Sequence, residues 1–106
     1  MIDVDSGRDF ASIGARLELL REWRGAKQKD MAAMAGVTPQ AWNNWIRGRA
    51  RPDIEQVWDL CRETGVTSDW IYFGHRSGLP LRFVDWLVRG RDQSKPGGTR
   101  RLIDKI

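Results

Sequence analysis

Glycines at short intervals divide the middle of this chain into segments that end before a long helix could form. Five of them each follow an apolar periodic segment: Gly25, Gly36, Gly48, Gly65 and Gly74. Glycine adopts the left-handed conformation found at helix C-termini without steric cost. Within the segments apolar residues recur three and four positions apart, and no segment alternates as a strand does. The sequence therefore predicts an all-α fold of short helices.

The flanking residues of these segments are typical helix starts. Thr38 before Pro39 supplies a hydroxyl cap, followed by a proline at the first position, where its missing N–H costs nothing. Asp53, with Gln56 three residues later, has the pattern of a capping box. The five predicted helices cover residues 10–24, 28–35, 39–47, 53–64 and 68–73. The inward-facing residues expected in the first, second and fourth helices are Phe10, Ile13, Leu17, Leu20, Met31, Ala32, Ala35, Ile54, Val57, Leu60 and Cys61.

Beyond these helices the sequence predicts a C-terminal extension. After a connector at residues 75–79, Pro80 can occupy the first turn of a sixth helix over about residues 80–89. One side of this helix carries Phe83, Val84, Leu87 and Val88. The expected organisation is an N-terminal arm (1–9), a five-helix domain (10–74) and an extension (75–106) that ends in a flexible linker (91–98) and a basic tail.

The cysteine and histidine content excludes several kinds of site. One cysteine and one histidine in 106 residues rule out a disulfide scaffold and a zinc site built only from those ligands. Cys61 lies on an expected inward face, and His75 has no carboxylate or cysteine at ligand spacing. Asp3, Asp5 and Asp9 lack the glycine and the terminal glutamate of a calcium-binding loop. We therefore expect no metal, no cofactor, no small-molecule substrate and no enzymatic activity.

Hydropathy and charge limit where in the cell the protein can act and which kind of partner it can bind. No apolar run approaches the ~20 residues that cross a bilayer, and the acidic N-terminus is unlike a secretory signal. These features favour a cytoplasmic protein without a membrane partner. The formal net charge is +4, and residues 76–106 hold eight basic against three acidic side chains. This balance favours a polyanionic partner, but only mildly.

The helices predicted at 28–35 and 39–47, with Gly36 between them, form the pattern of a helix-turn-helix unit. In such a unit the first helix crosses the DNA backbone. The second helix lies in the major groove, with its N-terminal residues at the base edges. Many all-α proteins contain two short helices joined at a glycine, so this pattern alone is weak evidence.

A longer set of residues, in a fixed order, is more specific. It comprises Ile13–Leu17, Leu20–Arg21, Gln28–Ala32, Gly36–Thr38, Trp45, Gly48, Arg51–Pro52, Gly65–Val66, Asp69–Ile71 and Gly74. Across residues 13–74 this set resembles the Xre/Cro/lambda-repressor-like helix-turn-helix family. The resemblance implies a five-helix lambda-repressor-like domain that binds double-stranded DNA, here with an additional C-terminal helix and a basic tail.

By this resemblance, the residues just after the cap of the 39–47 helix read bases: Pro39, Gln40, Asn43 and Asn44. Pro39 departs from the polar residue common there and cannot hydrogen-bond a base, which shifts the reading to the three amides. Such amides pair with adenine N6 and N7, a contact worth about 1–3 kcal/mol. We therefore expect A·T pairs under Gln40 and Asn44. The alternatives are a solvated Gln40, and phosphate or local capping contacts for Asn43 and Asn44.

The resemblance also places DNA phosphates at two further points. Gln28 opens the 28–35 helix, where unpaired N–H groups and the helix dipole favour an anion. Arg47, Arg49 and Arg51 follow the 39–47 helix, and guanidinium groups suit phosphates, which fix register without reading sequence. The alternative for these arginines is a solvated basic loop. The remaining phosphate candidates are Lys27, Lys29 and Thr38.

For several residues the sequence leaves open whether they pack inside the domain or contact a partner. Trp42 and Trp45 match packing positions of the family. Ile46 stands where the family usually has an acid, so it either removes a negative charge beside the DNA or extends a packing patch. The sixth helix either packs on the first and fifth helices or forms a two-fold contact with a partner chain. The candidate dimer contacts are Phe83, Trp86 and Leu87.

Together these features predict a small prokaryotic or phage transcriptional regulator. The resemblance implies a homodimeric repressor that occludes a two-fold operator through the major groove. One alternative is an antitoxin-type autoregulator whose tail holds a protein partner. Another is a protein-interaction module that kept the fold and lost DNA binding. Pro39 and Ile46 slightly favour that module, and the arginine cluster disfavours it.

Overall fold

The computed structural model describes residues 8–90. In chain order its helices are α1 (Phe10–Arg24), α2 (Gln28–Ala35), α3 (Pro39–Ile46), α4 (Ile54–Thr64), α5 (Ser68–Phe73) and α6 (Leu81–Asp85), and a π-helical turn (Trp86–Gly90) follows α6. No strand occurs between residues 8 and 90. The predicted all-α class, with five helices and an added sixth, is confirmed. The linker and the basic tail lie outside the described residues, as do residues 1–7 of the N-terminal arm.

The ends of the helices follow the local signals in the sequence. α1, α2 and α5 have the predicted bounds, whereas α3 ends one residue early, with Arg47 as its C-terminal cap. The capping side chains accept hydrogen bonds from backbone N–H groups, which satisfies donors that a helix start leaves unpaired. The capping contacts join the side chains of Asp9, Thr38 and Thr67 to the N–H groups of Ser12, Ala41 and Trp70, and the Asp53 N–H to the side chain of Gln56.

The interior is filled by aliphatic side chains and tryptophans. Trp42 and Trp70 are fully buried, as are most of the predicted inward-facing residues. Ile54 is an exception: its side chain is 67% exposed, so its assignment to the core is wrong. It is the first residue of α4, and the buried stripe of that helix starts only at Val57, one turn later. Phe10, the first residue of α1, is also exposed.

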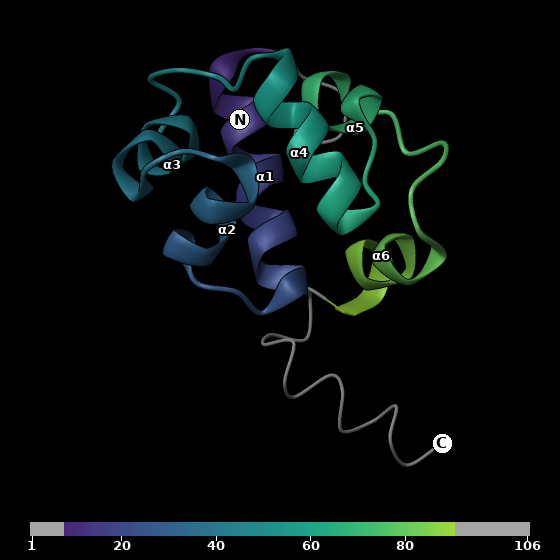
Figure 1. Cartoon of the computed structure of the whole chain (residues 1–106). Coiled ribbons are helices and arrows are strands. Elements are labelled where there is room, and N and C mark those ends of the chain that lie inside the picture. The colour runs from purple at the N-terminus through teal and green to yellow at the C-terminus, as the bar shows by residue number, and fades with distance from the viewer. Residues whose placement is uncertain (1–7, 91–106) are drawn as a thin grey trace.

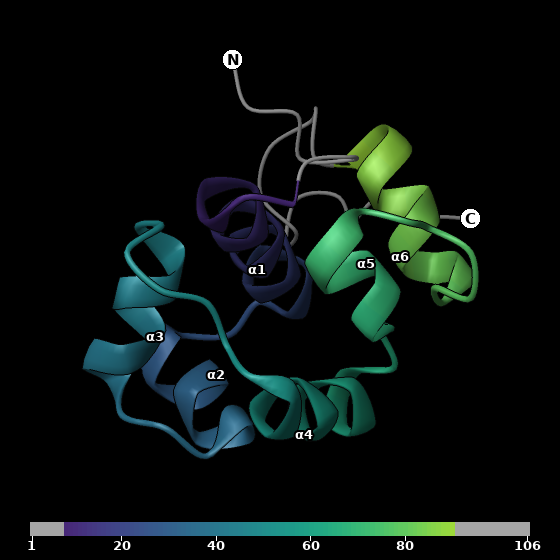
Figure 2. The same cartoon turned by 90° about the horizontal axis from the view of Figure 1, so that it is seen from above.

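α1 passes through the centre of the domain, with α2 and α3 on one side and α5 and α6 on the other (Figures 1 and 2). The contact between α1 and α3 depends on Gly14. A Cβ placed on Gly14 would lie 2.3 Å from the carbonyl oxygen of Trp45 and 2.7 Å from that of Ile46. Backbone therefore packs directly against backbone here, which fixes the position of α3 on α1.

A buried arginine joins α1 to α5. The Arg16 side chain is fully buried, and its Nη1 donates a hydrogen bond to the carbonyl oxygen of Ile71 over 2.6 Å. Burying a guanidinium is tolerated only where its donors find acceptors. The long, planar side chain thereby holds α5 to α1 at the centre of the fold.

The sixth helix packs onto its own domain. The Phe83 ring is buried between Trp23 of α1, at 4.5 Å between ring centroids, and Trp70 of α5, at 5.0 Å. Trp86 and Leu87 are also buried, whereas Val88 is 59% exposed and does not belong to the packed side. Of the two alternatives for this helix, the structure shows packing within the domain. Phe83, Trp86 and Leu87 are therefore corrected from dimer contacts to core residues, because this packing leaves little of them for a partner.

The cap of α1 makes stability depend on pH. Hydrogen bonds from the side chain and the backbone N–H of Ser12 lower the pKa of the Asp9 carboxyl below its usual value of 3.8. Because the folded pKa is the lower one, this stabilisation is complete above about pH 4 and is lost as the pH falls through the folded pKa. An Asp9→Asn variant keeps a capping oxygen that does not titrate. We expect its urea midpoint to fall less than that of the wild type between about pH 6 and about pH 3. Equal falls would contradict this role of Asp9.

Candidate nucleic-acid interface

α2 and α3 are joined by a tight turn at Gly36. This glycine has φ +75°, the left-handed conformation that other residues adopt only with strain. The N–H of Val37 then bonds to the carbonyl oxygen of Ala32, and Thr38 caps the start of α3. α3 packs against both α1 and α2 and forms the edge of the domain that faces away from α6 (Figures 1 and 2). This is the arrangement of a helix-turn-helix domain.

α3 has a buried aromatic face and an outer polar face. Trp42 and Trp45 are 0% and 4% exposed, with their ring centroids 5.8 Å apart, so the predicted packing of both is confirmed. Pro39 and Gln40 are exposed at the N-terminal end of the helix. The four predicted base-reading residues therefore differ in their environments: the first two are exposed, and Asn43 and Asn44 are half-buried.

The arginines after α3 do not share one environment. The N–H of Arg49 bonds to the carbonyl oxygen of Asn44 over 2.9 Å, and its side-chain Nη1 lies 3.5 Å from Asn44 Oδ1. Arg49 is thus folded back beside the outer face of α3. Arg47, at the C-terminal cap, is exposed. Arg51 instead lies over the ring of Phe10, at 5.4 Å from the ring centroid, which directs its side chain toward the start of α1.

α2 differs from the other helices of the domain at its N-terminus. Lys27 has the extended backbone of a capping residue, with φ −85° and ψ 160°, but its side chain makes no capping hydrogen bond. α1, α3 and α5 start with a capping side chain and α4 starts with a capping box, whereas α2 has neither. Lys27, Gln28 and Lys29 are all exposed, and Asp30 is the acidic residue in this first turn. Uncapped N–H groups at a helix start can accept an anion.

The basic residues here were singled out from the sequence, but the missing cap was overlooked. Lysine has no acceptor atom and cannot cap a helix in the way that Thr38 does. Lys27 was therefore a signal in the sequence that α2 starts without a side-chain cap.

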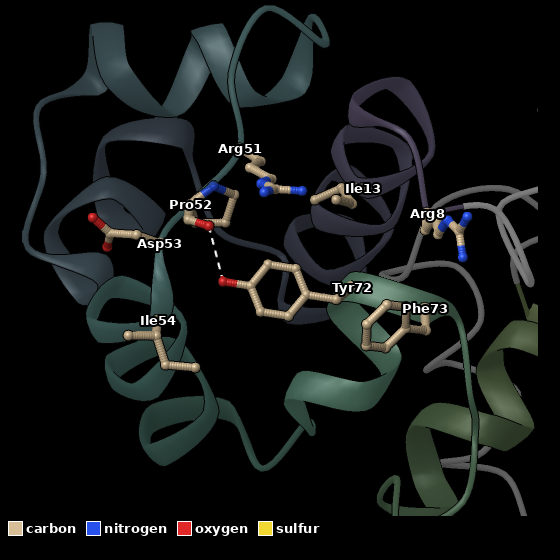
Figure 3. Close-up of a pocket in the computed structure, with 8 residues that line it drawn as sticks. All are labelled: Arg8, Ile13, Arg51, Pro52, Asp53, Ile54, Tyr72 and Phe73. Carbon is tan, nitrogen blue, oxygen red and sulfur yellow. Dashed lines mark hydrogen bonds between the residues drawn. The ribbon is translucent and has the colours of Figure 1, made fainter.

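A pocket that the sequence analysis missed lies beside the segment that follows α3 (Figure 3). It has a volume of about 420 Å³ and forms where the segment between α3 and α4 meets the end of α5 and the start of α1. Pro52 and Asp53 contribute to one wall. The other lining residues are Arg8, Ile13, Arg51, Ile54, Tyr72 and Phe73.

The remaining candidate chemistry is sparse in the part of the chain that the structure describes. Burial raises the pKa of the half-buried Cys61 thiol, which disfavours the nucleophilic thiolate. No group of three histidine, cysteine or acidic side chains between residues 8 and 90 could hold a metal ion. Over the same residues, no helix combines the length and apolar character of a membrane span.

Comparison with known proteins agrees with this geometry. The profile of the helix-turn-helix family matches residues 17–71, and the chain belongs to this family in its Xre/Cro/lambda-repressor-like form. The resemblance inferred from the sequence is therefore confirmed. No solved structure matches the chain.

Two curated relatives are similar over the same region. One is the SPbeta prophage-derived uncharacterized HTH-type transcriptional regulator YonR of Bacillus subtilis (strain 168), 33% identical over 68 residues. The other is the Repressor protein CI of Enterobacteria phage phi80, also 33% identical over 68 residues. Each match covers 64% of this chain, and it spans 63% of the first relative and 28% of the second. Both names describe regulators and neither describes an enzyme.

Proposed function

We propose that this chain is a sequence-specific, double-stranded DNA-binding transcriptional regulator that acts as a repressor in the cytoplasm. Residues 10–74 form the DNA-binding unit, and α3 enters the major groove. The observation that carries the proposal is the uncapped start of α2, with Lys27, Gln28 and Lys29 exposed around it. A helix start left without a cap is suited to a phosphate, and in a helix-turn-helix unit the first helix crosses the DNA backbone.

Base reading falls to the N-terminal half of α3. Gln40 is exposed one residue after Pro39 and can place its amide on a base edge. Since Pro39 lacks an N–H, it can contribute only apolar contact. Asn43 and Asn44 are closer to the body of the domain and approach bases only when α3 lies deep in the groove. Glutamine and asparagine amides select adenine, so we propose an operator with A·T pairs under Gln40 and Asn44.

Phosphate contacts come from the two ends of the unit. Lys27, Gln28, Lys29 and the Thr38 hydroxyl provide them at the helix starts, and Arg47 and Arg49 beyond the end of α3. Arg51 can contribute once it leaves the Phe10 ring. The five basic side chains of this set are Lys27, Lys29, Arg47, Arg49 and Arg51.

The proposed operator has two-fold symmetry, and the active form is a homodimer. Helix-turn-helix dimers place their recognition helices about 34–36 Å apart, one turn of DNA. The dimer surface does not include Phe83, Trp86 or Leu87, because these residues are buried in the domain. A monomeric mass in sedimentation at micromolar concentration, with and without a duplex, would contradict the homodimer.

A protein-interaction role on the same fold is the second candidate, either as an antitoxin-type autoregulator or without DNA binding. The observation that favours it is a pair of exposed apolar side chains on α4. Ile54 and Trp58 are 67% and 65% exposed and lie one turn apart. Neighbouring exposed apolar side chains that form one patch are a feature of protein-interaction sites.

The test is a salt-titrated binding assay on genomic duplexes that include the region upstream of the chain's own gene. If about five phosphates are neutralised, log K falls against log salt with a slope of about −4.5. Arg49→Ala is expected to lower this slope by about 1 and to weaken all duplexes alike. Gln40→Ala is expected to cost about 1–3 kcal/mol on the preferred site only.

Arg82→Ala is the matched control, because Arg82 is an exposed arginine on α6, across the domain from α3 (Figure 1). It should bind as the wild type does. Failure of the wild type to bind any duplex at low salt would contradict the proposal. In that case the protein-interaction role becomes the better reading.

A further inference from the structure

The pocket beside the candidate DNA interface combines apolar walls with positive charge (Figure 3). Its volume of about 420 Å³ falls within the range of about 300–1,000 Å³ usual for small-molecule sites. It is formed by segments that are far apart in the sequence. The start of α1, the α3–α4 segment and the end of α5 each supply part of it.

The apolar side chains of this pocket are unusually exposed. Ile54 is 67% and Phe73 is 45% exposed, although both are large apolar residues in a small domain. The Tyr72 ring is half-buried, and its hydroxyl donates to the carbonyl oxygen of Pro52 over 2.9 Å. Because that hydrogen bond occupies the polar end of the tyrosine, the ring presents an apolar surface. A flat apolar ligand could cover these groups.

The charged side chains of the pocket leave an excess of positive charge. Arg8 and Arg51 both line it, and neither forms an ion pair within residues 8–90. The single acid, Asp53, is the N-terminal capping residue of α4, so two positive charges of the lining stand against one negative charge. In Figure 3 the Arg51 side chain extends from the α3–α4 segment toward Ile13 of α1. Two guanidinium groups beside an apolar wall suit a carboxylate.

We propose that this pocket binds a small aryl carboxylate, with the ring against Ile54, Tyr72 and Phe73 and the carboxylate on Arg51 and Arg8. A ligand with a single acidic group matches the charge of the lining, which holds two guanidinium groups against one carboxylate.

Such a ligand would also affect DNA binding, a consequence that rests on the proposed function. Arg51 belongs to the basic segment that follows α3. A carboxylate on its guanidinium removes one positive charge from that segment and holds the side chain near α1. We expect a saturating ligand to weaken DNA binding about threefold to tenfold at constant ionic strength.

The test uses the full chain and the probe 1-naphthoate, followed by backbone NMR shifts in the absence of DNA. Saturable shifts are expected around Arg51, Tyr72 and Phe73, with a Kd of about 1 mM or below. Arg51→Met and Arg8→Met should each weaken binding at least about fivefold, because each keeps an apolar stem and loses the charge. Arg82→Met, outside the pocket, should bind as the wild type does.

Neutral 1-naphthalenemethanol and inorganic phosphate separate the two parts of the proposal. Each is expected to bind at least about tenfold more weakly than naphthoate. Equal binding of the alcohol would overturn the role of the arginines, and equal binding of phosphate would overturn the role of the apolar wall. Absence of saturable shifts at about 10 mM naphthoate, or shifts centred on Trp58 and Cys61 instead, would overturn the site. Since this experiment contains no DNA, its failure is distinct from failure of the proposed function.

Discussion

Replacing Gly14 with alanine is expected to lower the free energy of unfolding by about 3 kcal/mol and to abolish DNA binding at the growth temperature. The added Cβ would lie 2.3 Å from the carbonyl oxygen of Trp45 and 2.7 Å from that of Ile46. Both neighbours are backbone atoms of α3, so no side-chain rotation relieves the clash. α3 must move away from α1, and the buried Trp42 and Trp45 side chains move with it.

The sign of this effect is opposite to the usual one. In an ordinary helix interior, alanine is more stable than glycine by roughly 0.5–1 kcal/mol. Gly14 lies within α1, so helix propensity alone predicts a gain. A measured loss therefore reports the contact between α1 and α3 and not the intrinsic stability of α1.

Gly25→Ala is the matched control. Gly25 has φ +65°, and a Cβ there would meet nothing within 4 Å. Its replacement is expected to cost about 1 kcal/mol, from left-handed strain alone. Urea unfolding followed by tryptophan fluorescence should rank wild type above Gly25→Ala, and Gly25→Ala above Gly14→Ala. A Gly14→Ala variant as stable as the wild type would mean that α3 does not rest on α1 as the structure shows.

The helix bounds were predictable because their signals are local. Asp9, Thr38 and Thr67 each cap the turn that follows them, and Gly36 supplies the left-handed residue after α2. Burial was less predictable, because it depends on which elements come together. Ile54 has the same spacing from Val57 as a buried residue would have, yet no described element covers it.

The candidate interface was also predictable only where its signals are local. The sequence predicted that Gln40, Asn43 and Asn44 lie on α3, because the bounds of a helix fix which residues share its face. Nothing local shows that Arg51 lies over Phe10, because that contact joins the start of α1 to the segment before α4. The pocket was missed for the same reason, since Arg8 and Tyr72 come to line one pocket only through the packing of α1 against α5.

Lys27→Asp is expected to stabilise the fold and to remove DNA binding. Lys27 already has the backbone conformation of a capping residue, with no capping side chain. An aspartate there can accept from the free N–H groups of the first turn, a gain of about 0.5–1 kcal/mol. Repulsion from Asp30, in the same turn, keeps the gain at the low end of the range for capping residues. The same carboxylate occupies the N–H groups proposed to hold a phosphate and repels that phosphate. We expect DNA affinity to fall roughly 100-fold, a change of about 3 kcal/mol.

Lys27→Ser and Lys27→Ala separate the cap from the charge. Serine caps α2 without a negative charge, so it should raise the urea midpoint relative to alanine while costing DNA binding no more than alanine does. Both neutral variants should lower the slope of log K against log salt by about 1. The distinctive result is Lys27→Asp, which should unfold at a higher urea concentration than Lys27→Ala and bind DNA far more weakly than either neutral variant. If Lys27→Asp bound DNA as well as Lys27→Ser does, no phosphate would lie at the start of α2. The uncapped start of α2 would then no longer support the proposed function.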